Sequence, residues 1–261
     1  MPSLAYLRVD NVSKRFGSGA ARVSAMEGVS FDVRQGTFLS ILGPSGCGKS
    51  TLFNLIAGLM KPTEGDVTIG GASVIMKPGQ VGYMLQKDLL LPWRAIEDNI
   101  ILGQTLHGAG KRSAAAQAEP LIERCGLKGF ERCRPHQLSG GMRQRAALLR
   151  TLLTGKDVLL LDEPFGALDA ITRLQLQMLL TDVWQEMQKT ILFVTHDVDE
   201  ALLLSDEILL LSARPGRVLR RFTVDLPRPR KPEMLADSGV AALKAEIMSM
   251  LWKEVCRHDP C

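Results

Sequence analysis

The chain has 261 residues, a formal net charge of +4, 46% hydrophobic residues and 23% charged residues. This length can form one large α/β domain with a sizeable core, or two small lobes. The weak positive charge argues against nucleic acid as a partner, and no apolar run approaches the roughly 18–20 residues that cross a bilayer.

Two further features bear on the compartment of the protein. The first residues mix polar and apolar side chains and show no basic and apolar leader, so we expect a cytosolic protein. The five cysteines form no CxxC pair, which argues against a zinc site and a disulfide framework. Cys47 lies where a helix is expected to begin, and the amides there are expected to lower the pKa of its thiol. The alternative is that Cys47 is a small filler residue without a redox role.

The N-terminal part of the chain shows short strand patterns before its first helix. Residues 7–12 and 29–33 are expected to be strands joined by a polar loop at 17–21. Residues 38–42 are a short apolar run between two glycines, which predicts a buried strand. A helix is expected at 50–59, where a Lys-Pro pair then ends it.

The rest of the chain alternates between strand and helix patterns around a helical middle from about residue 88 to 156. Strands alternating with helices predict an α/β fold with a mainly parallel sheet covered on both faces, an antiparallel N-terminal portion and an inserted helical subdomain. Strands are expected at 66–69, 81–85, 158–161, 191–195 and 208–211, and helices at 114–125, 141–153, 170–187, 198–204 and 240–255.

These patterns predict four regions. Residues 1–87 form the first part of a nucleotide-binding core and residues 88–157 the helical subdomain. Residues 158–226 complete the core, and residues 227–261 contain a stiff Pro-rich linker and a tail helix.

The run GPSGCGKS at residues 43–50 is a phosphate-binding loop between an expected strand and an expected helix. Its glycines let backbone amides surround phosphates, and the start of the helix adds a positive partial charge. Lys49 is placed to reach the β- and γ-phosphates, and Ser50 to coordinate Mg²⁺. The expected nucleotide-binding residues are Gly43, Pro44, Ser45, Gly46, Cys47, Gly48, Lys49, Ser50 and Thr51.

Two acidic residues, Asp162 and Glu163, close the apolar strand at 158–161. A strand end of this kind delivers carboxylates to the sheet edge where nucleotides bind. Asp162 is expected to hold Mg²⁺, and Glu163 to polarise the attacking water as general base. The alternative, that two acids merely end a strand, remains open from this segment alone.

The run LSGG at residues 138–141 lies between the phosphate loop and this acidic strand end. Ser139 is suited to cap the helix that follows, and amides at a helix start also suit a phosphate. The order and spacing of the three motifs resemble those of the ABC-type ATPases, and the resemblance covers most of the chain. The expected fold is therefore a P-loop NTPase core of the ABC type. The chain departs from the family's commonest form at Met142, where Gln is usual.

The resemblance implies ATP hydrolysis, with ATP and Mg²⁺ as cofactors. It implies that His196 contacts the γ-phosphate and that Gln86 reaches Mg²⁺ and the attacking water. It also implies that Phe16 stacks on the adenine ring, for which the alternative is a core Phe.

The resemblance further implies that two chains pack head to tail around two ATP molecules. Ser139, Gly140 and Gly141 of one chain would serve the nucleotide held by Lys49 and Glu163 of the other. Residues 167–169, which follow the acidic pair, would meet the same loop of the second chain.

Three observations favour transport over other tasks of this superfamily. The chain has one phosphate loop, and it lacks a long coiled-coil insertion. Residues 88–95, DLLLPWRA, are apolar and aromatic, which would suit a groove for a short helix of a membrane subunit. A buried Trp93 is the alternative.

The elements LLPWR, THDVDEA, SARPGRV and PRPR are similar to those of importer ATPases for nitrate, sulfonates, taurine, bicarbonate and related solutes. This resemblance implies a homodimer bound to integral-membrane permease subunits, and indirectly to a solute-binding protein, at the cytoplasmic face of the inner membrane. Two other functions remain open from the residues. They are a soluble ABC-type ATPase acting on nucleic acid or a protein complex, and a P-loop kinase, which would leave LSGG unexplained.

Overall fold

The computed structural model describes residues 5–17, 22–166 and 168–258. It divides the chain into two compact units, residues 1–80 with 190–261 and residues 81–189. Within the described ranges, no helix combines the length and the apolar character needed to cross a bilayer.

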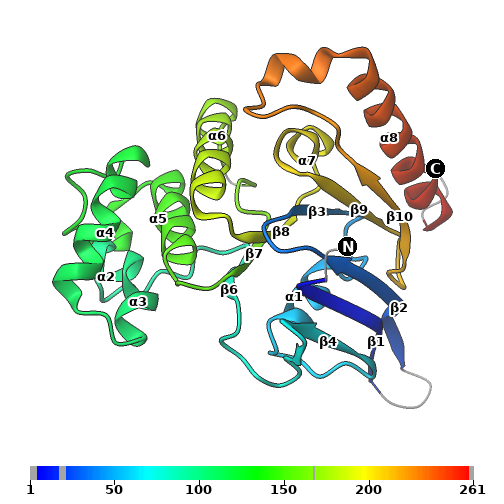
Figure 1. Cartoon of the computed structure of the whole chain (residues 1–261), viewed down its shortest axis with the longest axis horizontal. Coiled ribbons are helices and arrows are strands. Elements are labelled where there is room, and N and C mark those ends of the chain that lie inside the picture. The colour runs from blue at the N-terminus through cyan, green and yellow to red at the C-terminus, as the bar shows by residue number, and fades with distance from the viewer. Residues whose placement is uncertain (1–4, 18–21, 167, 259–261) are drawn as a thin grey trace. The chain divides into compact units, whose positions relative to one another are not determined.

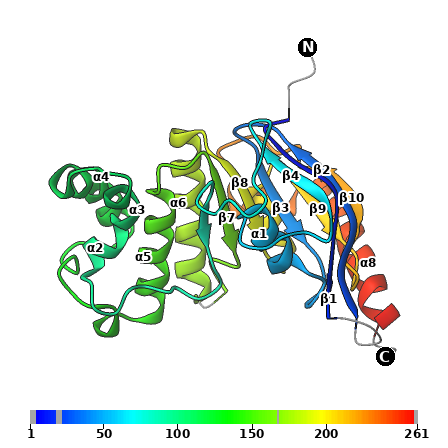
Figure 2. The same ribbon diagram turned by 90° about the horizontal axis from the view of Figure 1, so that it is seen from below.

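The first unit begins with an antiparallel sheet whose strand order is β2-β1-β4-β5. Its strands are β1 (Leu7–Phe16), β2 (Val23–Val33), β4 (Glu64–Ile69) and β5 (Ala72–Ser73). The strands β1, β2 and β4 lie side by side in both ribbon views (Figure 1, Figure 2). The first two are longer than the sequence predicts, because ladder pairing continues through polar residues, with Arg15 opposite Ser24 and Phe16 opposite Val23.

The same unit contains strands in the order β10-β9-β3-β8. These are β3 (Phe38–Leu42), β8 (Thr190–Val194), β9 (Glu207–Leu211) and β10 (Val218–Thr223). Strand β3 pairs in parallel with β8 and β9, and all three are buried along their whole length. Strand β10 pairs antiparallel with β9 at an edge, and its exposed basic residues explain why the sequence does not reveal it.

The helices of the first unit are α1 (Lys49–Ile56), α7 (Val198–Leu204), the 3₁₀ turn η3 (Pro232–Ala236) and α8 (Ser238–His258). One apolar cluster joins α7, β9, β10 and α8 through Leu202, Ile208, Phe222 and Ile247. The Pro-rich segment before η3 is anchored by the buried Arg230, which donates to the carbonyls of Leu202 at 2.9 Å and Ser205 at 2.6 Å. The pKa of Arg230 is lowered to about 10. The main cause is burial, and the positive charge of the nearby Arg228 acts in the same direction.

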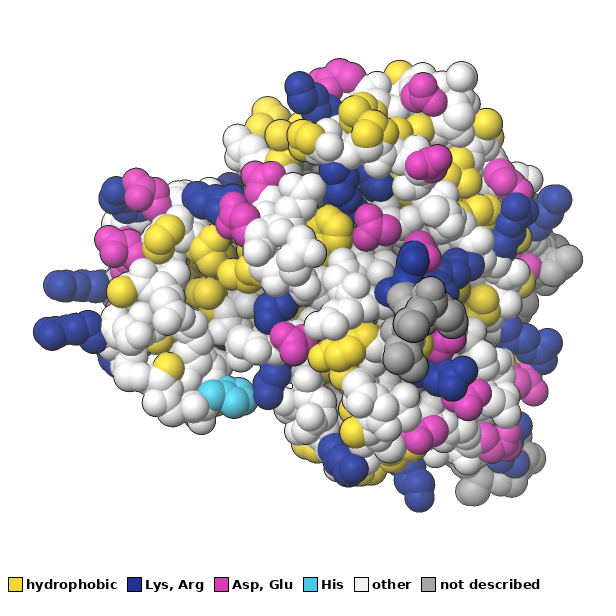
Figure 3. All heavy atoms as spheres, viewed as in Figure 1, with side chains coloured by type: hydrophobic (Ala, Val, Ile, Leu, Met, Phe, Trp, Pro, Cys, Tyr) yellow, Lys and Arg dark blue, Asp and Glu magenta, His cyan; other side chains and the backbone are white. Residues whose placement is uncertain are grey.

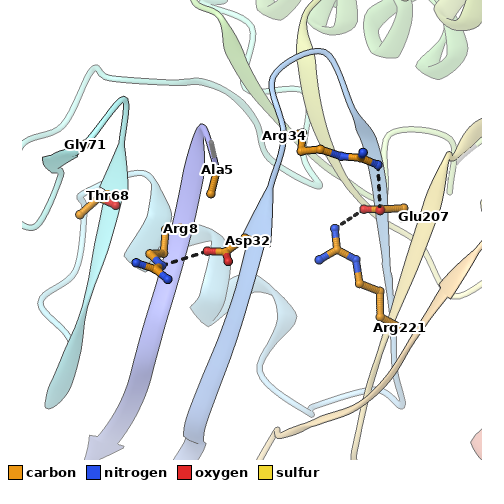
Figure 4. Close-up of a pocket in the computed structure, with 8 residues that line it drawn as sticks. All are labelled: Ala5, Arg8, Asp32, Arg34, Thr68, Gly71, Glu207 and Arg221. Atoms are coloured by element: carbon orange, nitrogen blue, oxygen red, sulfur yellow. Dashed lines mark hydrogen bonds and ion pairs between the residues drawn. The ribbon is translucent and has the colours of Figure 1, made fainter. Parts of the chain in front are cut away.

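Ion pairs on the strands of the first unit surround an open polar pocket of about 710 Å³ (Figure 4). Arg8 on β1 pairs with Asp32 on β2 at 3.1 Å. Glu207 on β9 pairs with both Arg34, at 3.5 Å, and Arg221 on β10. The three arginines that line this pocket thus have carboxylate partners within the unit. The exposed pair of Arg8 and Asp32 adds little to stability, whereas Glu207 is buried.

The second unit contains the parallel strands β6 (Gly82–Met84) and β7 (Val158–Asp162). The buried residues of α4, among them Ala118 and Ile122, show the spacing of an amphipathic helix, whereas α5 is buried over most of its circumference, from Ala146 to Leu149 without a break. The helix α6 has the bounds that its sequence predicts. The helical elements are α2 (Ile96–Ile100), α3 (Leu102–Leu106), α4 (Lys111–Arg124), η2 (Pro135–Gln137), α5 (Gly140–Leu152) and α6 (Ala170–Met187).

Candidate functional site

The loop at residues 43–48 connects β3 to α1, as the sequence predicts. Gly48 takes the position before the first turn of α1 with a φ of 105°, which glycine adopts without steric cost. None of the described side chains caps this end, and no acidic residue lies in the first turn. The first amides of the helix are therefore suited to bind an anion, and the loop fits a nucleotide phosphate.

The side chain of Lys49 is buried and folds back over the loop. Its ammonium donates to the carbonyls of Gly43 at 2.7 Å and Pro44 at 3.0 Å. A buried ammonium needs such acceptors, and a phosphate oxygen would offer a stronger, charged one at the same place. Lys49 is thus held where the phosphates of a nucleotide would enter.

The turn at residues 212–216 packs against the phosphate loop and supports it. The amide of Gly216 donates to the carbonyl of Ala25 at 3.0 Å, and the amide of Glu27 donates to that of Gly216 at 3.0 Å. A Cβ atom at Gly216 would overlap the carbonyl oxygen of Cys47 in the loop itself. This support was not predicted from the sequence, although the residues SARPG that form the turn are a visible signal.

We expect Gly216→Ala to raise the Kd for ATP at least about tenfold, because the added methyl pushes the phosphate loop away from its place. Titration with a non-hydrolysable ATP analogue measures this. Gly110→Ala is the control, since a Cβ there meets no atom within 4 Å and its φ of −63° is one that alanine adopts freely. Equal ATP affinity of the Gly216→Ala protein and the wild type would contradict the support role.

The expectation that helix amides lower the pKa of the Cys47 thiol is wrong. Burial raises the pKa of its thiol, and the nearby Lys49 ammonium, which acts in the opposite direction, does not outweigh it. The side chain is fully buried, and its Sγ lies 3.9 Å from the Lys49 ammonium. Loss of water around the thiolate therefore outweighs the helix amides and the ammonium.

A raised pKa predicts that Cys47 resists alkylation at neutral pH. At pH 7 its thiolate fraction lies below that of a free thiol, and it grows only as the pH rises towards the raised pKa. We expect N-ethylmaleimide to label the half-buried Cys133 at least about tenfold faster than Cys47, as peptide mass spectrometry would show. Equal labelling at pH 7 would mean that the thiol is accessible and ionised.

Two other predicted contacts of the nucleotide belong to the first unit. Phe16 ends β1 with 39% of its surface exposed, so it is not a core residue, and the Lys14 ammonium lies 5.1 Å from the ring centre. His196 is exposed in the turn after β8. That turn is held by the Thr195 hydroxyl, which accepts from the amide of Asp197 at 3.0 Å and donates to Glu200 at 2.6 Å.

The acidic pair lies in the second unit at the end of β7. Asp162 is buried as the last residue of the strand, and Glu163 follows with a φ of 47°. A non-glycine residue in this left-handed region is strained, and such strain is concentrated at functional positions. Gln86 donates from its Nε2 to Oε2 of Glu163 at 3.2 Å. The structure thus brings together two of the three predicted catalytic side chains.

The LSGG run begins α5, as the sequence predicts. Ser139 is the N-cap residue, and its hydroxyl accepts from the amide of Met142 at 3.3 Å. Ser139 and Gly140 are exposed, and Gly141 is half-buried. In the loop after the acidic pair, residue 167 lies outside the described residues, and Asp169 caps α6 by accepting from the amide of Thr172 at 3.0 Å.

Arginines of α5 hold the segment that follows Gln86, which sequence reasoning did not foresee. Arg143 pairs with Asp88 at 3.1 Å, and Arg150 donates to the carbonyls of Asp88 at 2.6 Å and Leu89 at 2.8 Å. The arginines of the run RQRAALLR at residues 143–150, which follows LSGG, were the available signal. These bonds connect the LSGG helix to the segment that carries Gln86.

Trp93 is 69% exposed, which excludes the buried alternative. The turn that presents it is built on the fully buried Asn99. Asn99 accepts from the amide of Leu91 at 2.7 Å and donates to the carbonyls of Leu91 at 3.2 Å and Ala95 at 3.0 Å. The aromatic side chain is therefore held at the surface by a rigid turn rather than by a mobile loop.

A phosphate loop after β3, an acidic end of β7 and an LSGG-capped helix together define an ATP-binding cassette. The chain belongs to the ABC transporter family, whose model matches residues 26–166. It is 45% identical to the taurine import ATP-binding protein TauB of Rhizobium johnstonii, over 85% of each chain. It is 46% identical to the aliphatic sulfonates import ATP-binding protein SsuB of Bacillus licheniformis, over 83% of this chain and 84% of that one.

A solved structure agrees with this assignment. The dimeric ATP-binding cassette MJ0796, in a post-hydrolysis state bound to ADP and Pi, superposes with a TM-score of 0.76 at 30% identity. The match covers 85% of this chain and all of that one. The expected α/β fold of the ABC type is confirmed, and the chain is an ABC-type ATPase.

Proposed function

We propose that the chain is the energy-coupling ATPase of an importer for a small anion or organic solute of the sulfonate and taurine kind. The relatives named above are import ATP-binding proteins for such solutes. The observation that carries the proposal is the exposed Trp93 on a rigid turn, connected through Arg143 and Arg150 to the LSGG helix. A surface of this kind suits a cytoplasmic helix of a membrane permease.

In this proposal the phosphate loop binds the triphosphate of ATP. The amides at the start of α1 and the Lys49 ammonium would bind the phosphates, and Phe16 would stack on the adenine. Ser50, Asp162 and Gln86 are the residues that would hold Mg²⁺. The ion, when bound, would neutralise part of the phosphate charge. The hydroxyl, carboxylate and amide oxygens of these residues are ligands that Mg²⁺ prefers.

Glu163 would accept a proton from the attacking water. Its carboxylate is oriented by the hydrogen bond from Gln86, and its strained backbone holds it at the end of β7. His196 would donate a hydrogen bond to the γ-phosphate from the turn after β8. These residues would together position the water and stabilise the charge that develops on the phosphate.

Two chains would close head to tail on two ATP molecules, and a dimeric structure of the similar cassette MJ0796 bound to ADP and Pi supports pairing of this kind. The amides of Gly140 and Gly141 and the hydroxyl of Ser139 in one chain would then bind the γ-phosphate held by the other. Binding of ATP would close the dimer and hydrolysis would reopen it. The assembly would be peripheral to the cytoplasmic face of the inner membrane, with permease subunits and a solute-binding protein.

Trp93→Ala tests the permease contact. We expect co-purification with the permease and solute uptake to fall at least about tenfold, because an aromatic side chain that becomes buried in an interface contributes much of its binding energy. The ATPase activity of the isolated chain is expected to stay unchanged. Leu106→Ala is the matched control, since Leu106 is also an exposed apolar residue, at 75%. Full permease binding and uptake by the Trp93→Ala protein would overturn the docking role. Nucleic-acid-stimulated ATPase activity without any permease would favour the alternative, a soluble ATPase.

A further inference from the structure

The helix α8 (Ser238–His258) has two apolar faces, and its packing within the first unit uses one of them. Val240 and Ile247 are buried against the cluster around α7 and β9, with Leu243, Met250 and Leu251 partly buried beside them. In both ribbon views α8 lies along β10 at the edge of its unit (Figure 1, Figure 2). This inner face accounts for the position of the helix.

The outer face carries an apolar stripe at alternating spacings of four and three residues. Its members are Ala241, Ala245, Met248, Trp252 and Val255, and all five are exposed. Met248 is 50% and Trp252 64% exposed. Hydrophobic side chains are visible at the surface over the segment from η3 to α8 (Figure 3). An average spacing of 3.5 residues is that of a helix seam that packs on a second helix.

We propose that this stripe pairs antiparallel with the α8 stripe of a second copy of the chain. Side-chain size changes along the stripe, from two alanines at its start to Trp252 and Val255 at its end. In an antiparallel pair centred on Met248, Ala245 lies opposite the partner's Trp252, and Ala241 lies opposite the partner's Val255. Each large side chain then meets a small one, and the two Met248 side chains meet at the two-fold axis. A parallel pair would place Trp252 against Trp252 and leave a gap between the alanines.

The charges beside the stripe favour the same partner and the same direction. Glu246, which also pairs with Arg220, and Lys253 are exposed on one flank of α8. The antiparallel register brings Glu246 of each copy next to Lys253 of the other, so opposite charges meet on that flank. In a parallel two-fold pair this flank would face the opposite flank of the partner helix, so Glu246 and Lys253 would not meet.

The small residues Ala242 and Ser249 lie between this charged flank and the stripe, and both are exposed. They permit two helices to approach closely, so the charged side chains can reach across. The pairing uses only α8 and needs no nucleotide. It therefore goes beyond the ATP-closed dimer proposed above, and it does not depend on the transport role.

The first experiment tests the contact itself with the full chain and without nucleotide. In a background where Cys133, Cys256 and Cys261 are serine, Met248→Cys is expected to form a disulfide-linked dimer under mild oxidation. Met178→Cys on α6 is the matched control, because Met178 is 47% exposed on another helix. We expect at least about tenfold more cross-linked dimer from Met248→Cys, since the two thiols meet at the axis.

The second experiment tests the direction of the pair. A mixture of Ala241→Cys and Val255→Cys chains in the same background is expected to cross-link, whereas each variant alone is expected to stay monomeric under denaturing conditions. Predominant cross-linking within the Ala241→Cys variant would indicate a parallel pair and overturn the proposal.

The third experiment uses sedimentation velocity without a cross-link. Met248→Glu is expected to raise the dimer dissociation constant at least about tenfold, because two like charges would meet at the axis. Glu246→Lys is expected to raise it roughly two- to fivefold, and adding Lys253→Glu to that variant is expected to restore it. Both Glu246→Lys proteins lose the pair with Arg220, so their comparison isolates the contact between copies.

Two results would overturn the proposal. The first is a wild-type chain that stays monomeric at about 100 μM, well above the Kd of a specific weak dimer, with no excess of Met248→Cys cross-links over the control. The second is binding of the monomer to vesicles of anionic phospholipid that Met248→Glu abolishes, which would assign the stripe to a lipid surface. Either outcome leaves the proposed function as an importer ATPase intact, since the variants at Glu163 and Trp93 test that function separately.

Discussion

Replacement of Glu163 by Gln is expected to slow ATP hydrolysis at least about 100-fold, the range that a positioned general base contributes. The amide of Gln has nearly the shape of the carboxylate but accepts a proton poorly, so the chemical step is lost and the fold is kept. The hydrogen bond from Gln86 and the strained backbone at a φ of 47° show that this side chain is positioned rather than incidental.

The same variant is expected to bind ATP with unchanged affinity and to accumulate as an ATP-bound dimer. Binding does not require the base, whereas reopening of the proposed dimer requires hydrolysis. Single-turnover hydrolysis, ATP titration and size-exclusion chromatography with ATP and Mg²⁺ measure the three quantities. Glu119→Gln, at an exposed position of α4, is the control. Turnover at the wild-type rate would show that Glu163 is not the base.

Replacement of Lys49 by Ala is expected to weaken ATP binding by about 3 kcal/mol, or about 100-fold in Kd, because a charge-assisted hydrogen bond to phosphate is lost. The ammonium is buried and already lies at the mouth of the phosphate loop, 2.7 Å from the carbonyl of Gly43. Its loss therefore removes a pre-positioned charge rather than a mobile surface lysine.

The affinity for a non-hydrolysable ATP analogue, measured by calorimetry, provides the check. Lys61→Ala removes an exposed lysine beyond the end of α1 and is expected to leave the Kd unchanged. Unchanged affinity of the Lys49→Ala protein would count against a phosphate contact. Together the Lys49 and Glu163 variants separate binding from chemistry, since the first should lose affinity and the second should lose turnover.

Local patterns predicted several elements at their observed bounds. The strand at Phe38–Leu42 is a continuous apolar run between glycines, and the helices at Ala170–Met187 and Val198–Leu204 begin after the capping residues Asp169 and Asp197. Such signals lie within a few residues of each other, so the sequence displays them directly. Strand β10 has no such signal, because its exposed basic residues are ordered by pairing with β9.

The residues of the candidate site also fall into those that local sequence patterns reveal and those that depend on distant contacts. The sequence by itself determined the phosphate loop, the acidic strand end and the LSGG helix, because each depends on backbone amides or carboxylates at fixed spacing along one turn. Only the tertiary structure decided that Trp93 is exposed and that the pKa of the Cys47 thiol is raised. The exposure and the pKa of a side chain depend on how many atoms from distant segments of the chain surround it, and a local sequence pattern does not reveal that number. For the same reason, only the packing of one face of α8 shows that the stripe at Met248 and Trp252 is exposed.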